Sequence, residues 1–544
     1  MKLFKSVLVT AALAVVSLEA FPGVNLKNGN FYVSYTDIVV PGGGKKLEVT
    51  RTYNSRSADD GWFGLGWGSD FETYITVSAD GSVIVHENGS GAATRFTPKT
   101  AVDPKAAADK IVSLLKSKNG LPEKAANELS VKLVKDAELR REYEAKLDIQ
   151  TKIADGSVLY SNERGMQEIQ KIADGYKRVY SDGKVEVFNN TGKMIKTSEK
   201  SGYAITLNYK GKELESIKDS QAKQLFFSWY PDGKVKNIWS AGDKKVEYKF
   251  KEKDLIESKD VGDNVYKYTY DSNHNLVKIG YSDNTEMKIN YDSKTQMVAS
   301  IADKNGENTK YEYGQNPKNP EFHYWTLVTA NGFDGKPVTN RYEYEIKTKP
   351  DGAQYTYRIL TEINNLKTET IYSECCGLPL KIARGKEVTN FEYNAKGLLL
   401  KKNSTNGEFV NIDYDDTINK ITKVVNNSGW TQFTYDKQGN LSKALNSGGK
   451  AVLLVYDRNG RITKMVDNDS KTNEKRTLSF IYNALGKPVE ISMDSVGKIN
   501  VDYDNYGEIK KVESKAGHKM ALQVTQAFQN LLSIVKPAGV NLQL

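Results

Sequence analysis

Residues 435–445 read YDKQGNLSKAL, and residues 456–466 read YDRNGRITKMV. In both stretches a Gly follows the Tyr at the fourth position and an apolar residue follows at the sixth. A Gly at a fixed offset supplies the positive φ of a tight turn. In the strands that lead into the repeat tyrosines, apolar residues recur at every second position, as in Met287, Ile289 and Tyr291, which is the period of a strand with one apolar face. One unit therefore predicts two short strands joined by a turn, a β-hairpin.

The unit recurs along most of the chain. Tyrosines or phenylalanines at steps of 20 to 21 residues are Phe188, Tyr209, Tyr230, Phe250, Tyr270, Tyr291, then Tyr372, Tyr393, Tyr414, Tyr435, Tyr456, and, after one longer unit, Tyr482 and Tyr503. A single hairpin is marginal in water, but tandem hairpins can pair edge to edge and bury one face together. We expect residues 155–515 to form one continuous antiparallel sheet with the repeat tyrosines on a common face.

The Asp that follows many of these tyrosines has two interpretations. A calcium loop needs several oxygen ligands in one loop, whereas each turn here supplies one Asp. We therefore expect each Asp to accept hydrogen bonds from its own turn backbone. His274 stands where other units carry the turn Gly, and we interpret it as a turn residue. The structural repeat residues are Tyr270, Asp271, Tyr291, Asp292, Tyr393, Tyr414, Asp415, Tyr435, Asp436, Gly439, Tyr456, Asp457, Gly460, Tyr503, Asp504 and Gly507.

This pattern resembles the YD repeat of Rhs proteins. A second resemblance lies upstream, where residues 25–72 are similar to the domain that precedes the repeats in Rhs and wall-associated proteins; its most specific parts are TRTYNSRS at 50–57 and GWFGLGWG at 61–68. The resemblance implies a spiralling sheet that curls into a hollow shell, which in several members encloses a toxic C-terminal domain. The self-cleaving motif of those members is not visible in residues 500–544, so a toxin domain is not implied here.

The fold class is therefore mainly β: tandem hairpin repeats in a long antiparallel, curled or shell-like sheet, with a small helical insertion and a C-terminal helix. The expected divisions are a signal peptide at 1–20, an Rhs-type N-terminal β domain at 21–100, a helical insertion at 101–150, the repeat array at 151–515, and a C-terminal helix and tail at 516–544. Within the insertion, Ala-, Lys- and Glu-rich runs predict two helices at about 104–118 and 122–146.

The C-terminal segment predicts an amphipathic helix at 519–535. Its apolar face would consist of Val524, Phe528, Leu531, Leu532 and Val535. Such a face could cover the sheet of its own chain, dock on another protein or lie on a membrane. We expect it to be buried against the inner face of the repeat sheet, because that requires no partner and the last hairpin otherwise has a bare edge.

The N-terminus has the form of a secretory signal. Lys2 and Lys5 precede an uncharged apolar run from residue 6 to 18, and Ala20 suits the residue before cleavage. The run is too short to span a bilayer comfortably. We expect an exported protein, in the periplasm, at the cell surface or extracellular, with no transmembrane segment in the mature chain.

The two cysteines, Cys375 and Cys376, are adjacent. In an oxidising compartment they could form a vicinal disulfide, pair between chains or remain thiols. No CxxC spacing or His cluster accompanies them, so we expect no metal site and no cofactor.

The amino-acid composition and the sequence motifs limit the classes of function that we expect for this chain. The chain has 544 residues, is 39% hydrophobic, and contains 32 Tyr, 17 Phe and 6 Trp, enough large apolar surface for a folded sheet protein. The net charge of +9 is spread over many Lys without a basic stripe, so we expect no nucleic-acid partner. The four His lie in no catalytic or metal spacing, and no catalytic motif is present.

We therefore expect a non-enzymatic structural or interaction protein, a scaffold or adhesin-like surface whose partner is an unknown protein or a surface glycan. The first alternative is a small β-shell that encloses or chaperones a partner or toxin-like cargo. The second is a carbohydrate-active enzyme with paired carboxylates, whose convergence a sequence cannot reveal.

Overall fold

The computed structural model describes residues 22–40, 45–78, 80–98, 103–147, 149, 152–161, 165–200, 202–240, 245–332, 335–375, 377–483, 486–504, 509–514 and 517–535. The proposed signal peptide, Gly507 and Cys376 lie outside these residues. Among the described residues, none of the helices combines the length and apolarity that a membrane crossing requires.

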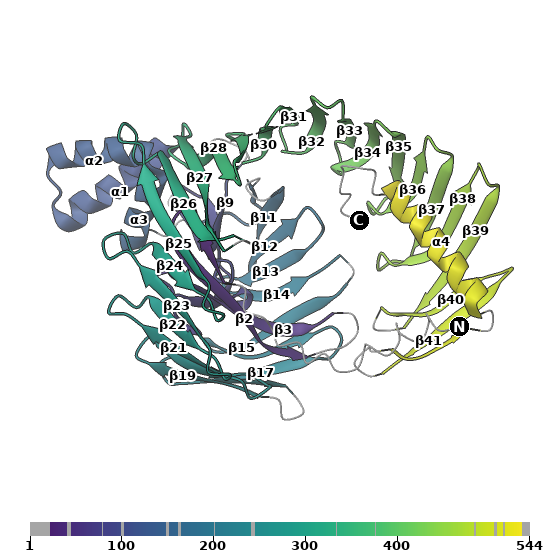
Figure 1. Ribbon diagram of the computed structural model, residues 1–544, viewed down its shortest axis with the longest axis horizontal. Coiled ribbons are helices and arrows are strands. Elements are labelled where there is room, and N and C mark those ends of the chain that lie inside the picture. The colour runs from purple at the N-terminus through teal and green to yellow at the C-terminus, as the bar shows by residue number, and fades with distance from the viewer. Residues whose placement is uncertain are drawn as a thin grey trace.

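A 33-stranded antiparallel sheet dominates the molecule, and its strands follow one another in strict chain order from β10 to β42. Figure 1 shows the sheet running from β11 in the middle through β17 and β19 at the bottom, up the left side to β28, and over the top to an arm on the right. The first and last strands are not paired with each other, so the curl is open. The predicted continuous sheet of hairpins is confirmed.

The strands of the first part of this sheet are β10 (Val158–Ser161), β11 (Gln167–Ile172), β12 (Gly175–Tyr180), β13 (Val185–Asn189), β14 (Met194–Ser198), β15 (Ala204–Lys210), β16 (Glu213–Asp219), β17 (Gln224–Trp229), β18 (Val235–Ser240), β19 (Lys245–Lys251), β20 (Asp254–Lys259), β21 (Val265–Tyr270), β22 (Leu276–Gly280), β23 (Glu286–Tyr291), β24 (Val298–Ala302) and β25 (Asn308–Gln315).

The remaining strands are β26 (His323–Asn331), β27 (Pro337–Thr348), β28 (Gln354–Ile363), β29 (Leu366–Tyr372), β30 (Pro379–Arg384), β31 (Glu387–Tyr393), β32 (Leu399–Ser404), β33 (Phe409–Asp415), β34 (Lys420–Asn426), β35 (Gly429–Tyr435), β36 (Leu441–Asn446), β37 (Lys450–Tyr456), β38 (Ile462–Asp469), β39 (Glu474–Tyr482), β40 (Pro488–Met493), β41 (Gly497–Tyr503) and β42 (Ile509–Ser514).

Each repeat tyrosine joins two neighbouring units. The strand pairing shifts by one residue immediately before the tyrosine, as between Val455 and Tyr456, which is the signature of a β-bulge. The tyrosine hydroxyl then donates to a backbone carbonyl of the preceding unit, from Tyr456 to Leu441 at 2.8 Å. The same bond is made by Tyr209, Tyr270, Tyr291, Tyr313, Tyr393, Tyr414, Tyr435, Tyr482 and Tyr503. The repeat spacing thus reflects a repeated tertiary contact.

The turns after these tyrosines are closed by the repeat Asp. Asp436 Oδ1 accepts from the backbone N–H of Gln438 at 2.9 Å and of Asn440 at 2.8 Å. Corresponding bonds reach Asp271, Asp292, Asp415 and Asp457. Gly439 has a φ of 79°, and His274 takes the same left-handed conformation with a φ of 63°.

One repeat position differs from the expectation. The register shift falls between Ser228 and Trp229, and Trp229 Nε1 donates to the carbonyl of Leu214 at 2.8 Å. Trp229 therefore occupies the tyrosine place, and Tyr230 begins the turn, where its N–H bonds to Lys234 O. An indole N–H replaces the phenol as donor, which a search for tyrosine spacing does not detect.

The N-terminal segment lies inside the curl (Figure 1). Its strands form three small sheets: β1 (Gly23–Asn25), β2 (Asn30–Val40), β3 (Leu47–Asn54) and β6 (Trp67–Ser69); β4 (Asp60–Gly61) and β5 (Gly64–Leu65); and β7 (Tyr74–Val77), β8 (Val83–Glu87) and β9 (Ala92–Phe96), with a 3₁₀ turn at Asp70–Glu72. One hydrophobic core joins its buried residues to those of the repeat strands as far as Ile301.

The two N-terminal motifs make that core. Arg51 of the first motif forms a fully buried ion pair with Asp37 at 2.7 Å and donates to Tyr268 at 2.7 Å, surrounded by aromatic rings. Trp67 of the second motif donates from Nε1 to the hydroxyl of the repeat tyrosine Tyr270 at 2.9 Å. Burying an Arg is costly unless its charge is paired. The bonds from Arg51 to Ser258 and Tyr268 therefore help to fix the position of this segment on the repeat sheet.

In the described part of the helical insertion there are three helices, α1 (Pro104–Asn119), α2 (Glu123–Lys135) and α3 (Ala137–Leu147). The prediction of one helix over 122–146 is therefore wrong. Asp136 interrupts it with extended backbone, and its Oδ1 caps α3 by accepting from Glu138 and Leu139 N–H at 3.0 Å. The break lets Ala137 N–H reach the carbonyl of Gly352, in the turn between β27 and β28.

The C-terminal helix α4 (Gly517–Val535) packs on the inner side of the right arm, against β36–β39, β41 and β42 (Figure 1). Leu531 and Val535 are buried, and Val524 and Phe528 pack against the same core. The prediction that Leu532 lies on this buried face is wrong, because its side chain is exposed. Met520 and Ile534 are buried, so the buried stripe is centred further round the helix than predicted.

A buried polar anchor fixes α4 to the sheet. Arg476 of β39 pairs with Asp467 of β38 at 2.7 Å, and it also donates to Gln523 of the helix at 2.8 Å. Asn530 of the helix lies 3.3 Å from both Asp467 oxygens. Because Arg476 and Asp467 are buried, their bonds to Gln523 and Asn530 favour one position of the helix on the sheet.

Candidate functional site

The two faces of the central strands β26–β31 have different chemistry. Strand register places six residues in one line across them, and we call this line the inner row: Tyr324, Tyr344, Ile359, Thr370, Ile382 and Thr389. Thr326, two residues from Tyr324 and so on the same face, donates to the carbonyl of Leu26 in the N-terminal segment at 2.6 Å. The inner row therefore lies on the face that the N-terminal segment and α4 cover elsewhere.

The inner row lies between the two hydrophobic cores. The core built around the N-terminal segment ends at Ile301, and the core under α4 begins at Val410. Most side chains of the inner row and of the adjacent Tyr342 are half-buried. Among the described residues, no hydrogen bond engages the hydroxyls of Tyr324, Tyr342 or Tyr344. A row of aromatic and β-branched side chains whose tyrosine hydroxyls are free is a surface that can bind another molecule.

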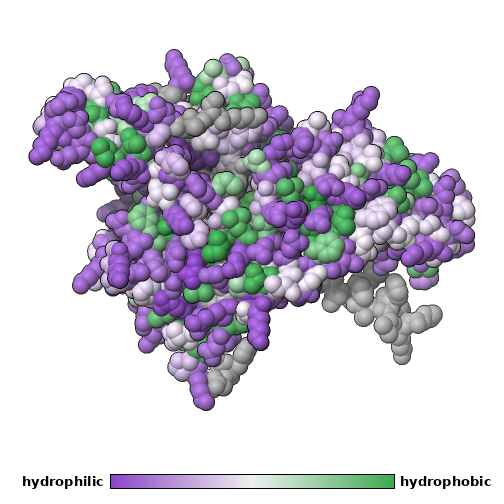
Figure 2. Space-filling view, turned by 90° about the horizontal axis from the view of Figure 1, so that it is seen from above, coloured by the Kyte–Doolittle hydropathy of each residue, from purple (hydrophilic) through white to green (hydrophobic). Residues whose placement is uncertain are grey.

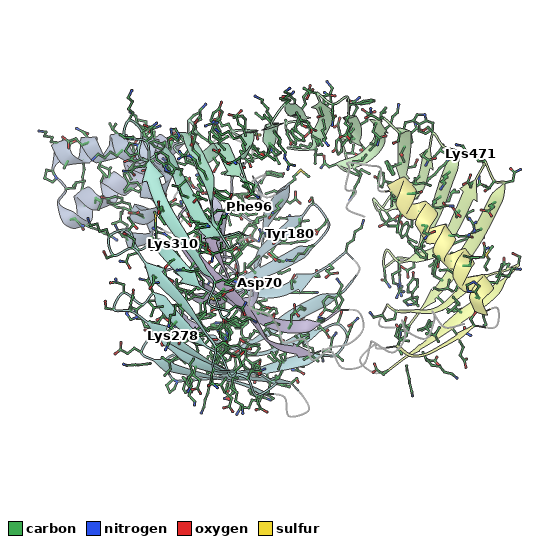
Figure 3. The ribbon with its side chains drawn as sticks, viewed as in Figure 1. Asp70, Phe96, Tyr180, Lys278, Lys310 and Lys471 are labelled. Atoms are coloured by element: carbon green, nitrogen blue, oxygen red, sulfur yellow. The ribbon has the colours of Figure 1, made fainter. Side chains whose placement is uncertain are left out.

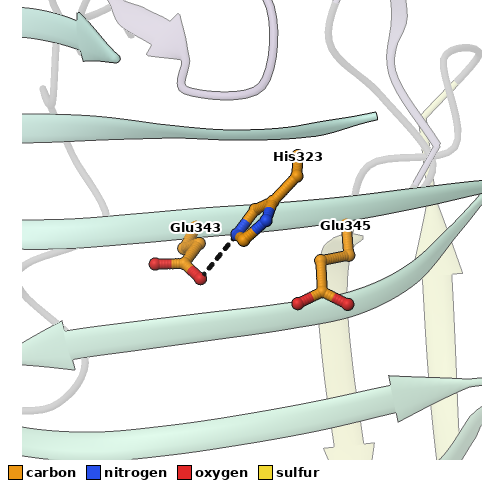
Figure 4. A group of neighbouring side chains, drawn as sticks. All are labelled: His323, Glu343 and Glu345. Atoms are coloured by element: carbon orange, nitrogen blue, oxygen red, sulfur yellow. Dashed lines mark hydrogen bonds and ion pairs between the residues drawn. The ribbon is translucent and has the colours of Figure 1, made fainter. Parts of the chain in front are cut away.

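The opposite face carries an ion-pair network. Figure 4 shows His323 beside Glu343 and Glu345, whose ligand atoms lie within 4.8 Å of one another. His323 Nε2 lies 2.9 Å from Glu343 Oε1, while Arg341 donates to the other Glu343 oxygen at 2.8 Å. Arg358 pairs with Glu345 at 2.7 Å and with Glu369 at 2.7 Å.

These arginines determine the chemistry of the cluster. Burial alone would raise the pKa of Glu343, but the hydrogen bonds from His323 and Arg341 hold it below its usual value. The bond from Arg358 likewise lowers the pKa of Glu369. The carboxylates are already neutralised by fixed guanidinium groups, so the cluster stabilises the sheet without offering free ligands. The sequence did not reveal it, because His323 and Glu343 are 20 residues apart and only the pairing of β26 with β27 joins them.

A cavity of about 510 Å³ separates the N-terminal segment from β12–β15. Figure 3 labels Asp70 and Tyr180 in its wall, inside the curl, whereas Lys278 and Lys310 lie on the left of the sheet. Two of its carboxylates, Glu87 and Glu186, bond to the same guanidinium, that of Arg178, at 2.7 and 3.1 Å. An acid and a base for sugar hydrolysis would need to ionise separately, which a shared arginine opposes.

The other residues predicted from the sequence lie in turns or in contacts between repeat units. Gly460 has a φ of 76° in its turn, and Tyr503 donates to the carbonyl of Pro488 at 3.0 Å. Cys375 follows β29, with its Sγ 3.7 Å from Ser373 Oγ. Since Cys376 lies outside the described residues, the vicinal disulfide stays a prediction.

The surface seen from above is mostly hydrophilic, with hydrophobic residues in small separate groups (Figure 2).

Two family models match parts of the chain. The model described as a domain of unknown function, DUF6531, matches residues 22–96, and the model described as the teneurin YD-shell matches residues 384–543. These matches support placing the chain with Rhs and YD-repeat proteins, in agreement with its repeat motifs and N-terminal segment. At this level, the chain is similar to YD-repeat shell proteins over the matched residues.

Named relatives share only part of their length with this chain. It is 36% identical over 76 residues to tRNA nuclease WapA of Bacillus subtilis (strain 168) and to tRNA3(Ser)-specific nuclease WapA of Bacillus spizizenii. The match spans 14% of this chain and 3% of each relative. The nuclease activity in those names is therefore not transferred to this chain.

Two solved structures are similar at low identity. The Photorhabdus luminescens Tc holotoxin pore has a TM-score of 0.37 and 11% identity, over 89% of this chain and 29% of the other. The TcdB2-TccC3-TEV crystal structure has a TM-score of 0.35 and 10% identity, over 94% of this chain and 31% of the other. Neither similarity is close enough to transfer a function.

Proposed function

We propose that this chain is an exported, non-enzymatic scaffold whose inner row binds a protein partner. The observation that carries the proposal is the uneven cover of one face of the sheet. The chain's own N-terminal segment and α4 cover that face at its two ends, whereas the inner row between them is not part of either core.

The chemistry of the inner row favours a protein over a glycan. Sugars stack on open aromatic faces, but the rings of Tyr324 and Tyr344 lie against each other, with centroids 5.7 Å apart and planes 30° apart. Beyond these two tyrosines the row continues with Ile and Thr residues, which suits the irregular apolar surface of a polypeptide. Tyrosine is among the residues that dominate protein interfaces.

The catalytic alternative lacks comparable support. In the part of the chain that the structure describes, the carboxylates beside His323 and those beside Arg178 are paired with arginines. These pairs are consistent with structural roles, and the proposal therefore assigns no reaction to the chain.

Site-specific photocrosslinking in the native cell tests the proposal. A benzoylphenylalanine at Tyr342 lies on the inner face, and the same probe at Leu360 lies on the opposite face, since Leu360 stands opposite Glu343. We expect a discrete protein adduct from position 342 and none from position 360. Absence of an adduct at 342, or equal adducts at both positions, would contradict the proposed binding face.

A further inference from the structure

The two edges of the large sheet are not equivalent. At the first edge, β9 covers β10 through a reciprocal pair of backbone bonds between Thr97 and Tyr160, at 2.8 and 2.9 Å. At the last edge, β42 pairs with β41 on one side, and among the described residues no strand pairs with its other side. An unpaired strand edge presents backbone donors and acceptors in a row.

Internal repeats show what normally covers such an edge. The second strand of a unit begins with a buried apolar residue such as Leu276, whose carbonyl accepts from Tyr291 of the next unit at 3.1 Å. Three residues further on, Ile279 stands directly opposite Met287 of that next unit and is fully buried. Leu441 and Ala444 are buried at the same two positions, beneath Tyr456 and opposite Val452.

Strand β42 carries the same two positions without their cover. Ile509 is 62% exposed and Val512 is 57% exposed, whereas Leu276 and Ile279 are 0% exposed. The pairing of Tyr503 with Ile509 and of Val501 with Val512 shows that β42 has the register of an ordinary second strand. The outer edge of β42 therefore has the register and the apolar residues that pair with the first strand of a following unit, and these residues are exposed.

We propose that the free edge of β42 is a strand-acceptor site for a partner segment of the repeat type: an extended, antiparallel strand of alternating apolar residues that ends in Tyr. The tyrosine hydroxyl donates to the Ile509 carbonyl, and an apolar side chain four residues before it covers Val512. The interface repeats the one that joins consecutive units, as between β22 and β23 and between β36 and β37. This mode of binding is strand addition.

The charged residues of β42 influence which partner strand would bind best. Lys511 occupies the place of Lys278, which stands opposite Lys288 in the internal pair. Lys510 beside it is exposed. In the internal pair Glu286 contacts both lysines, and Lys511 pairs with Glu513 at 2.5 Å. A carboxylate opposite Lys511 in a partner strand would add a second attraction to this lysine.

The chain itself supplies the probe. A synthetic peptide of residues 285–292, TEMKINYD, contains the strand that covers Leu276 and Ile279. We expect the fluorescently labelled peptide to bind the full chain saturably by anisotropy. The peptide with Y291F should bind about fivefold more weakly, because one hydrogen bond is lost. The peptide with K288E should bind more tightly at low salt and lose that gain at high salt.

Matched protein variants locate the site. V512K changes the edge, and V455K changes an exposed residue of the internal strand β37; both should keep the wild-type circular dichroism spectrum. V512K should weaken peptide binding at least tenfold, and V455K should leave it unchanged. A change beside the inner row, Y342S, should also leave it unchanged. The Y342S variant distinguishes peptide binding at the β42 edge from binding at the inner row, because it changes only the latter surface.

Two results would overturn the proposal. The first is absence of saturable binding, or binding that V512K does not affect. The second is self-association of the chain, measured by sedimentation, that V512K abolishes and that the peptide does not compete with; the occupant of the edge would then be a second copy.

Discussion

At the scale of single residues, the repeat depends on one hydrogen bond from each tyrosine to the unit before it. Tyr456 shows the arrangement: its hydroxyl donates to Leu441 O at 2.8 Å, and its ring packs against the core under α4. The bulge at Val455 turns the tyrosine toward its acceptor. The ring contributes burial, which any large apolar side chain could supply, and the hydroxyl adds one hydrogen bond between units. Phe188 and Phe250 keep the same bulge without that bond.

Replacing Tyr456 by Phe separates these two contributions. We expect the free energy of unfolding to fall by about 1 kcal/mol, the usual net value of one hydrogen bond, as measured by denaturant unfolding. Tyr342→Phe is the matched control, because no described group bonds to that hydroxyl, and it should change the stability by less than about 0.5 kcal/mol. Equal losses for both variants would show that the hydroxyl bond contributes nothing specific.

A second residue-scale prediction concerns pH. Burial raises the pKa of Glu72 to about 8, even though its carboxylate accepts from Trp62 N–H at 2.6 Å and Ser69 N–H at 2.9 Å. The folded state therefore holds a proton that the unfolded chain releases near its ordinary pKa. The stability from this group is fully present below about pH 4 and is lost as the pH rises toward 8, by at most about 1.4 kcal/mol per pH unit.

Glu72→Gln provides the comparison. Subtracting the free energy of unfolding of E72Q from that of the wild type at each pH should give a difference that falls between about pH 5 and pH 8. A difference that stays constant over this range would show that Glu72 is ionised in the folded protein.

At the scale of elements, α4 is a cover for one end of the inner face, held by an apolar stripe and a polar anchor. Leu531 is 7% exposed and its neighbour Leu532 is 49% exposed, so the two form a matched pair. Leu531→Asp should lower the free energy of unfolding by more than about 2 kcal/mol, because it loses apolar burial and buries a charge. Leu532→Asp should change it by less than about 0.5 kcal/mol.

Hydrogen exchange of residues 517–535 would measure the same difference locally. We expect L531D to expose the helix amides and L532D to leave them protected. If both variants exchange alike, α4 is not seated on the sheet by the face described here.

At the scale of the whole molecule, the repeat spacing predicted the sheet because every unit obeys the same local rules of alternation and turn chemistry. What it could not predict depends on contacts between distant residues. Trp229 takes a tyrosine's place because an indole can make the same bond. Asp136 ends α2 where the turn at Gly352 meets the helices. The guanidinium groups that neutralise the cluster at His323 come from two further positions of neighbouring strands, Arg341 and Arg358.

The central claim is that the inner face is covered at its two ends by the chain itself and remains accessible between them. Hydroxyl-radical footprinting of the isolated protein, read by mass spectrometry, tests it at individual tyrosines. Tyr324 and Tyr342 on the central strands should be oxidised readily, while Tyr248 and Tyr268, buried beneath the N-terminal segment, should be protected. Protection of Tyr324 and Tyr342 to the level of Tyr248 would contradict the claim, because it would mean that another part of the molecule covers the face.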